Sequence, residues 1–104
     1  MIVAIPSSSD KTDAFIDDRF ARCSFFCFYD TGTKVSKFMI NNFRNALEGV
    51  GPKVVEFLAG KGITEVYASE VGPKAQRLLD RLNIKTTIVS TKQTVQQIIN
   101  MLNN

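Results

Sequence analysis

Two copies of one short sequence decide the fold of the second half of the chain: Val50-Gly51-Pro52-Lys53 and, 21 residues later, Val71-Gly72-Pro73-Lys74. Glycine is common just before a helix, and proline is common at the first helical position. After the second copy, one apolar face is formed by Ala75, Leu78, Leu79 and Leu82 at helical spacing. Strand-like runs follow at 65–68 and 86–89. The sequence therefore predicts helix, strand, helix, strand over 50–89.

The rest of the chain adds three strands before this region and one helix after it. Residues 2–5 form a continuous apolar run closed by Pro6, which is typical of a strand buried on both faces. Residues 24–29 are rich in aromatic side chains, 30–33 have the composition of a hairpin turn, and 34–40 alternate as in an edge strand. A last helix carries Val95, Ile98, Ile99 and Leu102.

This order predicts a single α/β domain over residues 1–104. We place strand 2–5 in the centre because it is the most apolar. Parallel strands joined by helices cross over right-handed, and the helices cover both faces of the sheet. The expected fold is a ribonuclease H-like three-layer sandwich. Its five-stranded mixed sheet has the order 3-2-1-4-5, with strand 2 antiparallel.

Composition excludes several classes of protein. The 13 Lys and Arg against 10 Asp and Glu give a net charge of +3, too mild for a dedicated nucleic-acid binder. The chain has no His and only two Cys, which excludes a Ser-His-Asp triad and a four-Cys metal site within one chain. No apolar stretch is long enough to span a membrane, and the N-terminus is not that of a signal peptide. We expect a cytoplasmic protein with reduced thiols.

One edge of the predicted sheet collects the candidate site. The segments 7–22, 41–53, 69–73 and 90–94 all lie at the carboxyl ends of strands, where open α/β sheets bind ligands. Three helix N-termini would face this edge and favour an anion. The candidate residues there are Asn42, Gly51, Lys53, Gly72 and Lys74. In the alternative interpretation, each Gly-Pro-Lys is only a helix start with a solvated lysine.

The segment Arg19-Phe20-Ala21-Arg22-Cys23 closes the long loop before strand 24–29. Arg19 and Arg22 could clamp an anion in bidentate fashion, or they could pair with loop acids such as Asp17 and Asp18. Phe20 is expected to anchor the loop in the core rather than to form a stacking platform.

The two cysteines are predicted to differ. If both lay on one strand, their Cα atoms would be about 13 Å apart, beyond disulfide reach. Cys27 is expected to be a buried core thiol. Cys23 follows Arg22 at the site edge, where positive neighbours would favour a metal-binding thiolate. The alternative for Cys23 is an ordinary buried cysteine.

Two enzyme classes of this fold type are not supported. Ribonuclease H-type chemistry needs carboxylates that hold two metals, one of them on the first strand, and residues 2–5 carry none. A phosphate-binding glycine-rich sequence after that strand is also missing.

Several short segments, in order and spacing, resemble the dinitrogenase iron–molybdenum cofactor biosynthesis family: Met1 to Pro6, Arg19 to Cys23, Asn41-Asn42, Gly49-Val50-Gly51, Gly72 to Ala75 with Leu79 and Ile84, and Thr94-Val95. The resemblance implies a ribonuclease H-like fold and a carrier of iron–sulfur or iron–molybdenum cofactor precursors rather than an enzyme. The family's loop pattern is His-Phe-Gly-Arg followed by a small residue or Cys. Phe20 and Arg22 match it, Cys23 takes the last position, and Arg19 and Ala21 replace His and Gly.

The leading hypothesis is a carrier that holds an anionic metal–sulfur species, with Cys23 as a candidate metal ligand and Arg19, Arg22, Lys53 and Lys74 neutralising its charge. The second is a module that binds a small anionic metabolite without metal. The third is an interaction domain that docks on an assembly partner through strand 34–40. Catalysis ranks last because no acid–base constellation is visible.

Overall fold

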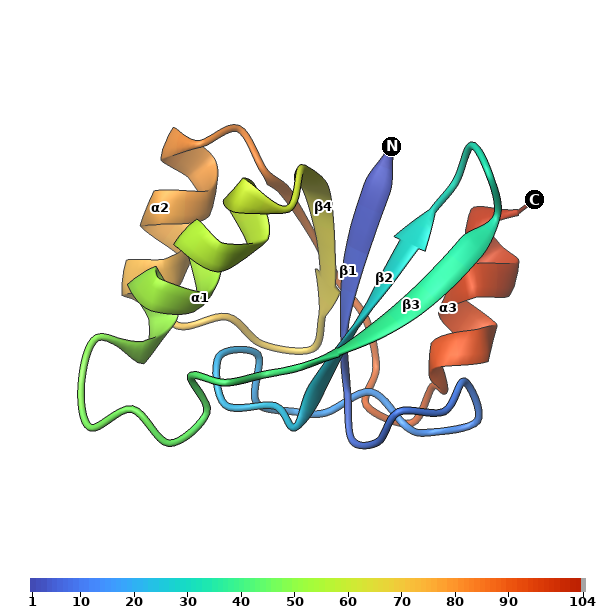
Figure 1. Ribbon diagram of the computed structural model, residues 1–104, viewed down its shortest axis with the longest axis horizontal. Helices are drawn as coiled ribbons and strands as arrows, with labels where there is room; N and C mark the ends of the chain where they lie inside the picture. The colour runs from blue at the N-terminus through green and yellow to red at the C-terminus, as the bar shows by residue number, and fades with distance from the viewer. Residues whose placement is uncertain (104) are drawn as a thin grey trace.

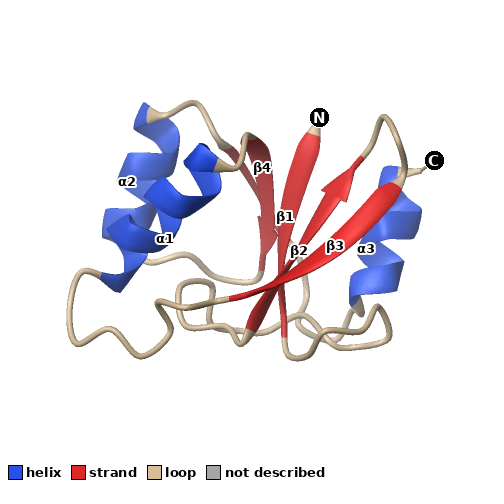
Figure 2. Ribbon diagram, in the orientation of Figure 1, coloured by secondary structure: helices blue, strands red, loops and turns tan. Residues whose placement is uncertain are grey.

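The β-sheet divides the protein into three layers, as Figures 1 and 2 show. The computed structural model describes residues 1–103. Helices α1 and α2 lie on one face of the sheet, and α3 lies on the other. The elements are β1 (Ile2–Ser7), β2 (Phe25–Asp30), β3 (Val35–Ile40), α1 (Val50–Gly60), β4 (Ile63–Ala68), α2 (Pro73–Arg81), β5 (Lys85–Ile88) and α3 (Val95–Leu102).

The strand order is β3-β2-β1-β4-β5, which confirms the predicted fold class. Strand β2 runs antiparallel to both β1 and β3, whereas β1, β4 and β5 are parallel. The carboxyl ends of the parallel strands therefore share one edge of the sheet. The alternating strand β3 lies at the outside, as predicted.

Strand β1 does not end at Pro6 but continues to Ser7. A proline in a central strand would normally break a ladder. Here β1 pairs with β4 only from Ile2 to Ala4. Thr31 N–H donates to the carbonyl of Met1, and the alternation from that pair turns the nitrogen of Pro6 away from β2, to the side where the pairing of β1 with β4 has already stopped. The carbonyl of Pro6 accepts from the Asp17 N–H at 3.1 Å.

Two separate cores lie on the two faces of the sheet. The larger core packs α1 and α2 against β1, β2 and β4, and it includes Phe20, Cys23 and Phe26. The rings of Phe20 and Phe26 meet edge-on with centroids 5.9 Å apart, so the prediction that Phe20 anchors the loop is confirmed. The smaller core packs α3 against β1 and β2 and includes Cys27 and Tyr29. The two cysteines thus lie on opposite faces of the sheet.

The two Gly-Pro-Lys copies start their helices differently. In α2, Gly72 is the N-cap and Pro73 the first helical residue, as predicted. In α1 the helix begins two residues earlier than predicted, at Val50, after the N-cap Gly49. Gly49 has a φ of +68°, a left-handed conformation that glycine adopts without strain and that turns the chain into the helix sooner.

Within residues 1–103, no helix is both long enough and apolar enough to cross a membrane.

Candidate anion-binding site

A pocket of about 690 Å³ lies between the loop before β2 and the starts of α1 and α2. Three of the four segments predicted to share this sheet edge contribute to it. Its lining residues are Asp18, Arg19, Phe20, Ala21, Gly49, Val50, Gly51, Pro52, Glu70, Gly72, Pro73, Lys74, Ala75 and Arg77. The fourth segment, 90–94, runs elsewhere, because Gln93 accepts from Ile16 N–H and Phe15 pairs with Thr94.

Two helix N-termini open into this pocket. The N-cap residues Gly49 and Gly72 have no side chain that could accept a hydrogen bond from the first turn. Exposed first-turn N–H groups and the helix dipole make such an end a binding place for anions. The third helix differs from the prediction, because Thr94 and Gln97 form a capping box at its N-terminus. The side chain of each residue accepts a hydrogen bond from the backbone N–H of the other, so these N–H groups are not free to bind an anion.

The two helix starts are held close together by a glycine. A Cβ atom placed on Gly51 would lie 3.2 Å from the Cβ of Ala75. Glycine at this position therefore lets the first turns of α1 and α2 approach each other across the pocket. The arrangement brings the partial positive charges of both helices to one place.

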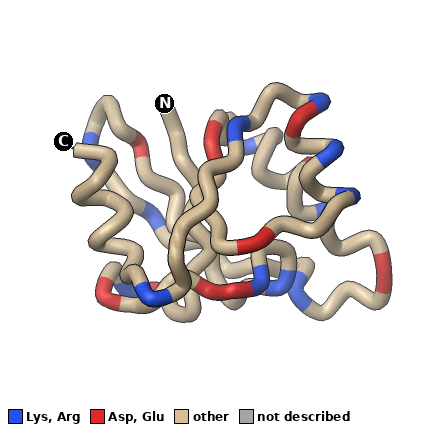
Figure 3. Tube along the Cα trace, turned by 180° about the vertical axis from the view of Figure 1, so that it is seen from behind, with Lys and Arg blue, Asp and Glu red and all other residues tan. Residues whose placement is uncertain are grey.

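Three basic side chains line the pocket, Arg19, Lys74 and Arg77, against the two acidic side chains of Asp18 and Glu70. Lys74 and Arg77 lie one turn apart on α2. Figure 3 shows that many of the basic positions gather along the layer formed by α1 and α2. The excess of positive charge and the two helix ends together favour an anionic ligand.

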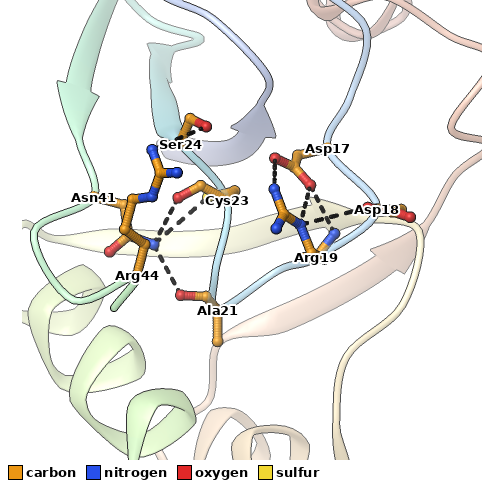
Figure 4. Close-up of polar contacts among 8 residues, drawn as sticks. All are labelled: Asp17, Asp18, Arg19, Ala21, Cys23, Ser24, Asn41 and Arg44. Atoms are coloured by element: carbon orange, nitrogen blue, oxygen red, sulfur yellow. Dashed lines mark hydrogen bonds and ion pairs between the residues drawn. The ribbon is translucent and has the colours of Figure 1, made fainter. Parts of the chain in front are cut away.

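Arg19 lies between the pocket and two loop acids. Its Nε is 3.3 Å from Asp17 Oδ1 and 3.8 Å from Asp18 Oδ1 (Figure 4). The hydrogen bond to Asp17, followed by that carboxylate's charge, raises the pKa of Arg19. Because the side chain is 59% exposed, the pair is solvent-screened. The alternative in which Arg19 pairs with Asp17 and Asp18 is therefore the one found here.

Arg22 lies outside the pocket lining. Its Nη1 donates to the carbonyl oxygen of Arg44 at 2.8 Å. The two arginines thus do not form a joint clamp, because Arg19 turns to Asp17 while Arg22 turns to the segment after β3.

Asn41 organises the backbone beneath the pocket. Its buried side-chain amide Nδ2 donates to the carbonyl oxygens of Ala21, at 2.8 Å, and Cys23, at 3.0 Å (Figure 4). Its Oδ1 accepts from the N–H of Phe43 at 3.1 Å. The asparagine predicted from the sequence was its neighbour Asn42, which is exposed and outside the lining.

Cys23 is fully buried, as the alternative of an ordinary buried cysteine predicts. Burial, followed by the charge of Asp17, raises the pKa of its thiol to about 12. The thiol is therefore protonated at neutral pH in this conformation, while the role of Cys23 as a metal ligand stays a prediction. The geometry explains why: β2 begins only at Phe25, and the preceding turn directs Cys23 into the larger core. Cys27 is buried, as predicted.

The part of the chain that the structure describes contains no cluster of three or more Cys, Asp or Glu side chains placed to hold a metal ion.

Comparison with known proteins identifies the family. The sequence pattern of the family described as dinitrogenase iron-molybdenum cofactor matches residues 1–104. The chain belongs to this family. No protein with a curated description matches the chain.

Two solved structures place this family member among similar folds. The apo form of the orange protein from Desulfovibrio gigas has a TM-score of 0.89 at 26% identity, over 95% of this chain and 83% of that chain. A protein from Thermotoga, described as a NifB-type member of the DUF35 family, has a TM-score of 0.82 at 36% identity, over 95% and 84%.

The predicted site residues of this dinitrogenase iron–molybdenum cofactor family member divide into two groups. Four line the pocket: Arg19, Gly51, Gly72 and Lys74. Four do not: Arg22, Cys23, Asn42 and Lys53. Arg77 was not predicted from the sequence, although its position three residues after Lys74 places both on one helix face.

Proposed function

We propose that this chain is a non-catalytic carrier that holds an anionic metal–sulfur cluster or cofactor precursor in the pocket between α1 and α2. The observation that carries the proposal is the meeting of two uncapped helix N-termini with Arg19, Lys74 and Arg77. Membership of the dinitrogenase iron–molybdenum cofactor family supports the choice of cargo.

The cargo would be held chiefly as an anion. Among the residues described, no metal-binding cluster accompanies the pocket, and the Cys23 thiol is buried and protonated at neutral pH. A cluster that arrives with its sulfide or thiolate ligands complete needs no protein ligand. It would accept hydrogen bonds from the first-turn N–H groups, and the basic side chains would neutralise its charge.

Cys23 remains a candidate metal ligand under one condition. The turn before β2 would have to open, because the thiol lies in the larger core and the carbonyls of Ala21 and Cys23 are tied to Asn41. Comparing wild type with Cys23→Ser separates the two modes of binding. If both proteins retain the cluster equally, the cargo is held by charge alone and not by a bond to Cys23.

The first test is anaerobic incubation of the protein with iron and sulfide, followed by desalting, a visible spectrum and iron quantitation. We expect a retained chromophore, and less retained iron in Lys74→Gln and Arg77→Gln. The matched control is Lys53→Gln, which removes a first-turn charge of α1 outside the pocket lining. Colourless, iron-free wild-type protein would contradict the proposed cargo.

A second candidate is favoured by the same lack of metal ligands among the described residues: a small phosphorylated or carboxylated metabolite bound at these helix ends. Calorimetric titration with inorganic phosphate tests it. Binding that weakens in Arg77→Gln, without retention of a cluster by wild type, would support the metabolite.

A further inference from the structure

A second surface, distant from the proposed cargo pocket, combines an open strand edge with a groove. Strand β3 is an outer strand of the sheet and runs along the front of the molecule in Figure 1. Beside it lies a groove of about 360 Å³ lined by Ile2, Phe28, Asp30, Thr33, Val35, Lys37 and Lys61. Lys61 follows the C-terminus of α1, whereas the cargo pocket lies at its N-terminus.

The backbone of β3 offers a regular set of outward groups. Asn41 N–H donates to Ser24 O at 3.0 Å, which fixes the phase of the antiparallel ladder with β2. Hydrogen-bonded pairs alternate along such a ladder, so Val35, Lys37 and Met39 bond inward to β2. The N–H and C=O groups of Ser36, Phe38 and Ile40 therefore point outward, where another strand could pair with them.

The side chains on the groove face of β3 specify what could pair there. Val35 is 50% exposed, and the groove floor beside it is formed by Ile2 and Phe28. Lys37 and Lys61 form no ion pair with any residue in 1–103. The Asp30 carboxylate already accepts hydrogen bonds from the N–H groups of Gly32, at 2.8 Å, and Thr33, at 3.3 Å. The groove thus offers apolar contact and two cations without an ion-pair partner in 1–103.

We infer that β3 is a docking edge for an extended segment of a partner protein that adds a strand to the sheet and places a carboxylate opposite Lys37, with apolar side chains two residues away on either side. Opposite charges directly across an antiparallel pair stabilise it, and like charges destabilise it. A second copy of this chain fits less well, because antiparallel pairing of two β3 strands through the outward groups of Ser36, Phe38 and Ile40 would place Met39, and no carboxylate, opposite Lys37. Lysine on an edge strand is a known protection against such self-pairing.

This inference goes beyond the proposed function and does not depend on it. A partner on β3 would leave the pocket at the N-terminus of α1 open, so cargo could enter or leave while the proteins are joined.

The test uses isotopically labelled full-length protein and the peptide acetyl-Thr-Val-Thr-Glu-Thr-Val-Thr-amide, which reads the same in both directions. We expect NMR shift changes centred on β3 and slower amide hydrogen exchange at Ser36, Phe38 and Ile40. Replacing the Glu of the peptide by Lys should weaken binding about threefold to tenfold. The protein variant Lys37→Glu should reverse this preference.

A backbone control separates strand addition from simple charge attraction. Ser36→Pro removes an outward N–H and should abolish binding, while Ser36→Ala should retain it. Thermal melting of both variants checks that the fold persists. The inference is overturned if the peptide changes no β3 signal at its highest soluble concentration, if the Glu and Lys peptides bind equally, or if β3 signals shift with protein concentration alone, which would assign the edge to a second copy.

Discussion

Gly51 in α1 and Ala75 in α2 pack so closely that a Cβ atom placed on Gly51 would lie 3.2 Å from the Cβ of Ala75. This contact joins the first turns of two helices whose N-termini line the same pocket. The spacing of these two helix starts therefore depends on the absence of a side chain at position 51.

Replacing Gly51 by Ala tests this contact against a matched glycine in the same helix. A Cβ atom placed on Gly60 would meet nothing within 4 Å, so Gly60→Ala should stabilise the protein by up to about 1 kcal/mol through helix propensity alone. Gly51→Ala should be about 1 kcal/mol less favourable than Gly60→Ala, because the helix starts must separate. Urea unfolding of both variants measures the difference.

Cargo retention by Gly51→Ala should also fall, since the two helix ends move apart. The double variant Gly51→Ala with Ala75→Gly removes the close contact and should recover part of the retention. Equal stability gains at positions 51 and 60 would show that the contact imposes no constraint.

Asn41 and its neighbour form a second matched pair. Asn41→Ala removes hydrogen bonds to the carbonyls of Ala21 and Cys23 and leaves the Phe43 N–H without its acceptor. Buried polar groups that lose their partners cost about 1–3 kcal/mol each, so we expect a loss of at least about 2 kcal/mol in the free energy of unfolding. Asn42→Ala, at an exposed position, should change it by less than about 0.5 kcal/mol. Chemical denaturation distinguishes these outcomes, and similar losses would contradict the assigned role of Asn41.

Because two thiols are buried in the native protein, we expect its stability to fall at alkaline pH. Burial raises the pKa of both Cys23 and Cys27 to about 12. Above the ordinary thiol pKa of about 8.5, the unfolded chain releases these protons while the native state keeps them. The free energy of unfolding should therefore be unaffected by the thiols below about pH 8. It should fall by about 1.4 kcal/mol per pH unit for each thiol between about pH 9 and 12.

Urea titrations between pH 8 and 10.5 measure this slope. Cys27→Ala should reduce the thiol contribution by half, whatever its effect on stability at pH 8. An unchanged slope in the variant would assign the alkaline loss to other groups.

Thr94 starts α3 with a capping box. Its side chain accepts from the N–H of Gln97 at 3.2 Å, and its own N–H donates to Gln97 Oε1 at 2.8 Å. Thr94→Ala should lower the free energy of unfolding by about 1 kcal/mol. Thr91→Ala, three residues earlier at an exposed position, is the control and should have little effect. If both variants unfold at the same urea concentration, the cap contributes nothing to stability.

Local sequence determined the elements and their order. The apolar run of residues 2–5, the alternation of 34–40 and the Gly-Pro start of α2 each depend on neighbours in the chain, and each was confirmed. The start of α1 was predicted two residues too late. Gly49 adopts a left-handed conformation that starts the helix earlier, and the spacing of glycine and proline in the sequence did not indicate this.

The tertiary structure decided which polar side chains meet. Cys23 and Asn41 are 18 residues apart, and Arg22 reaches the carbonyl of Arg44 across 22 residues. No pattern within either segment sets these contacts. Spacing within the sequence predicted only that a cysteine and two arginines lie near one edge of the sheet. Only the packing of the loop against β2 and α1 decided that the thiol is buried and that the two arginines separate.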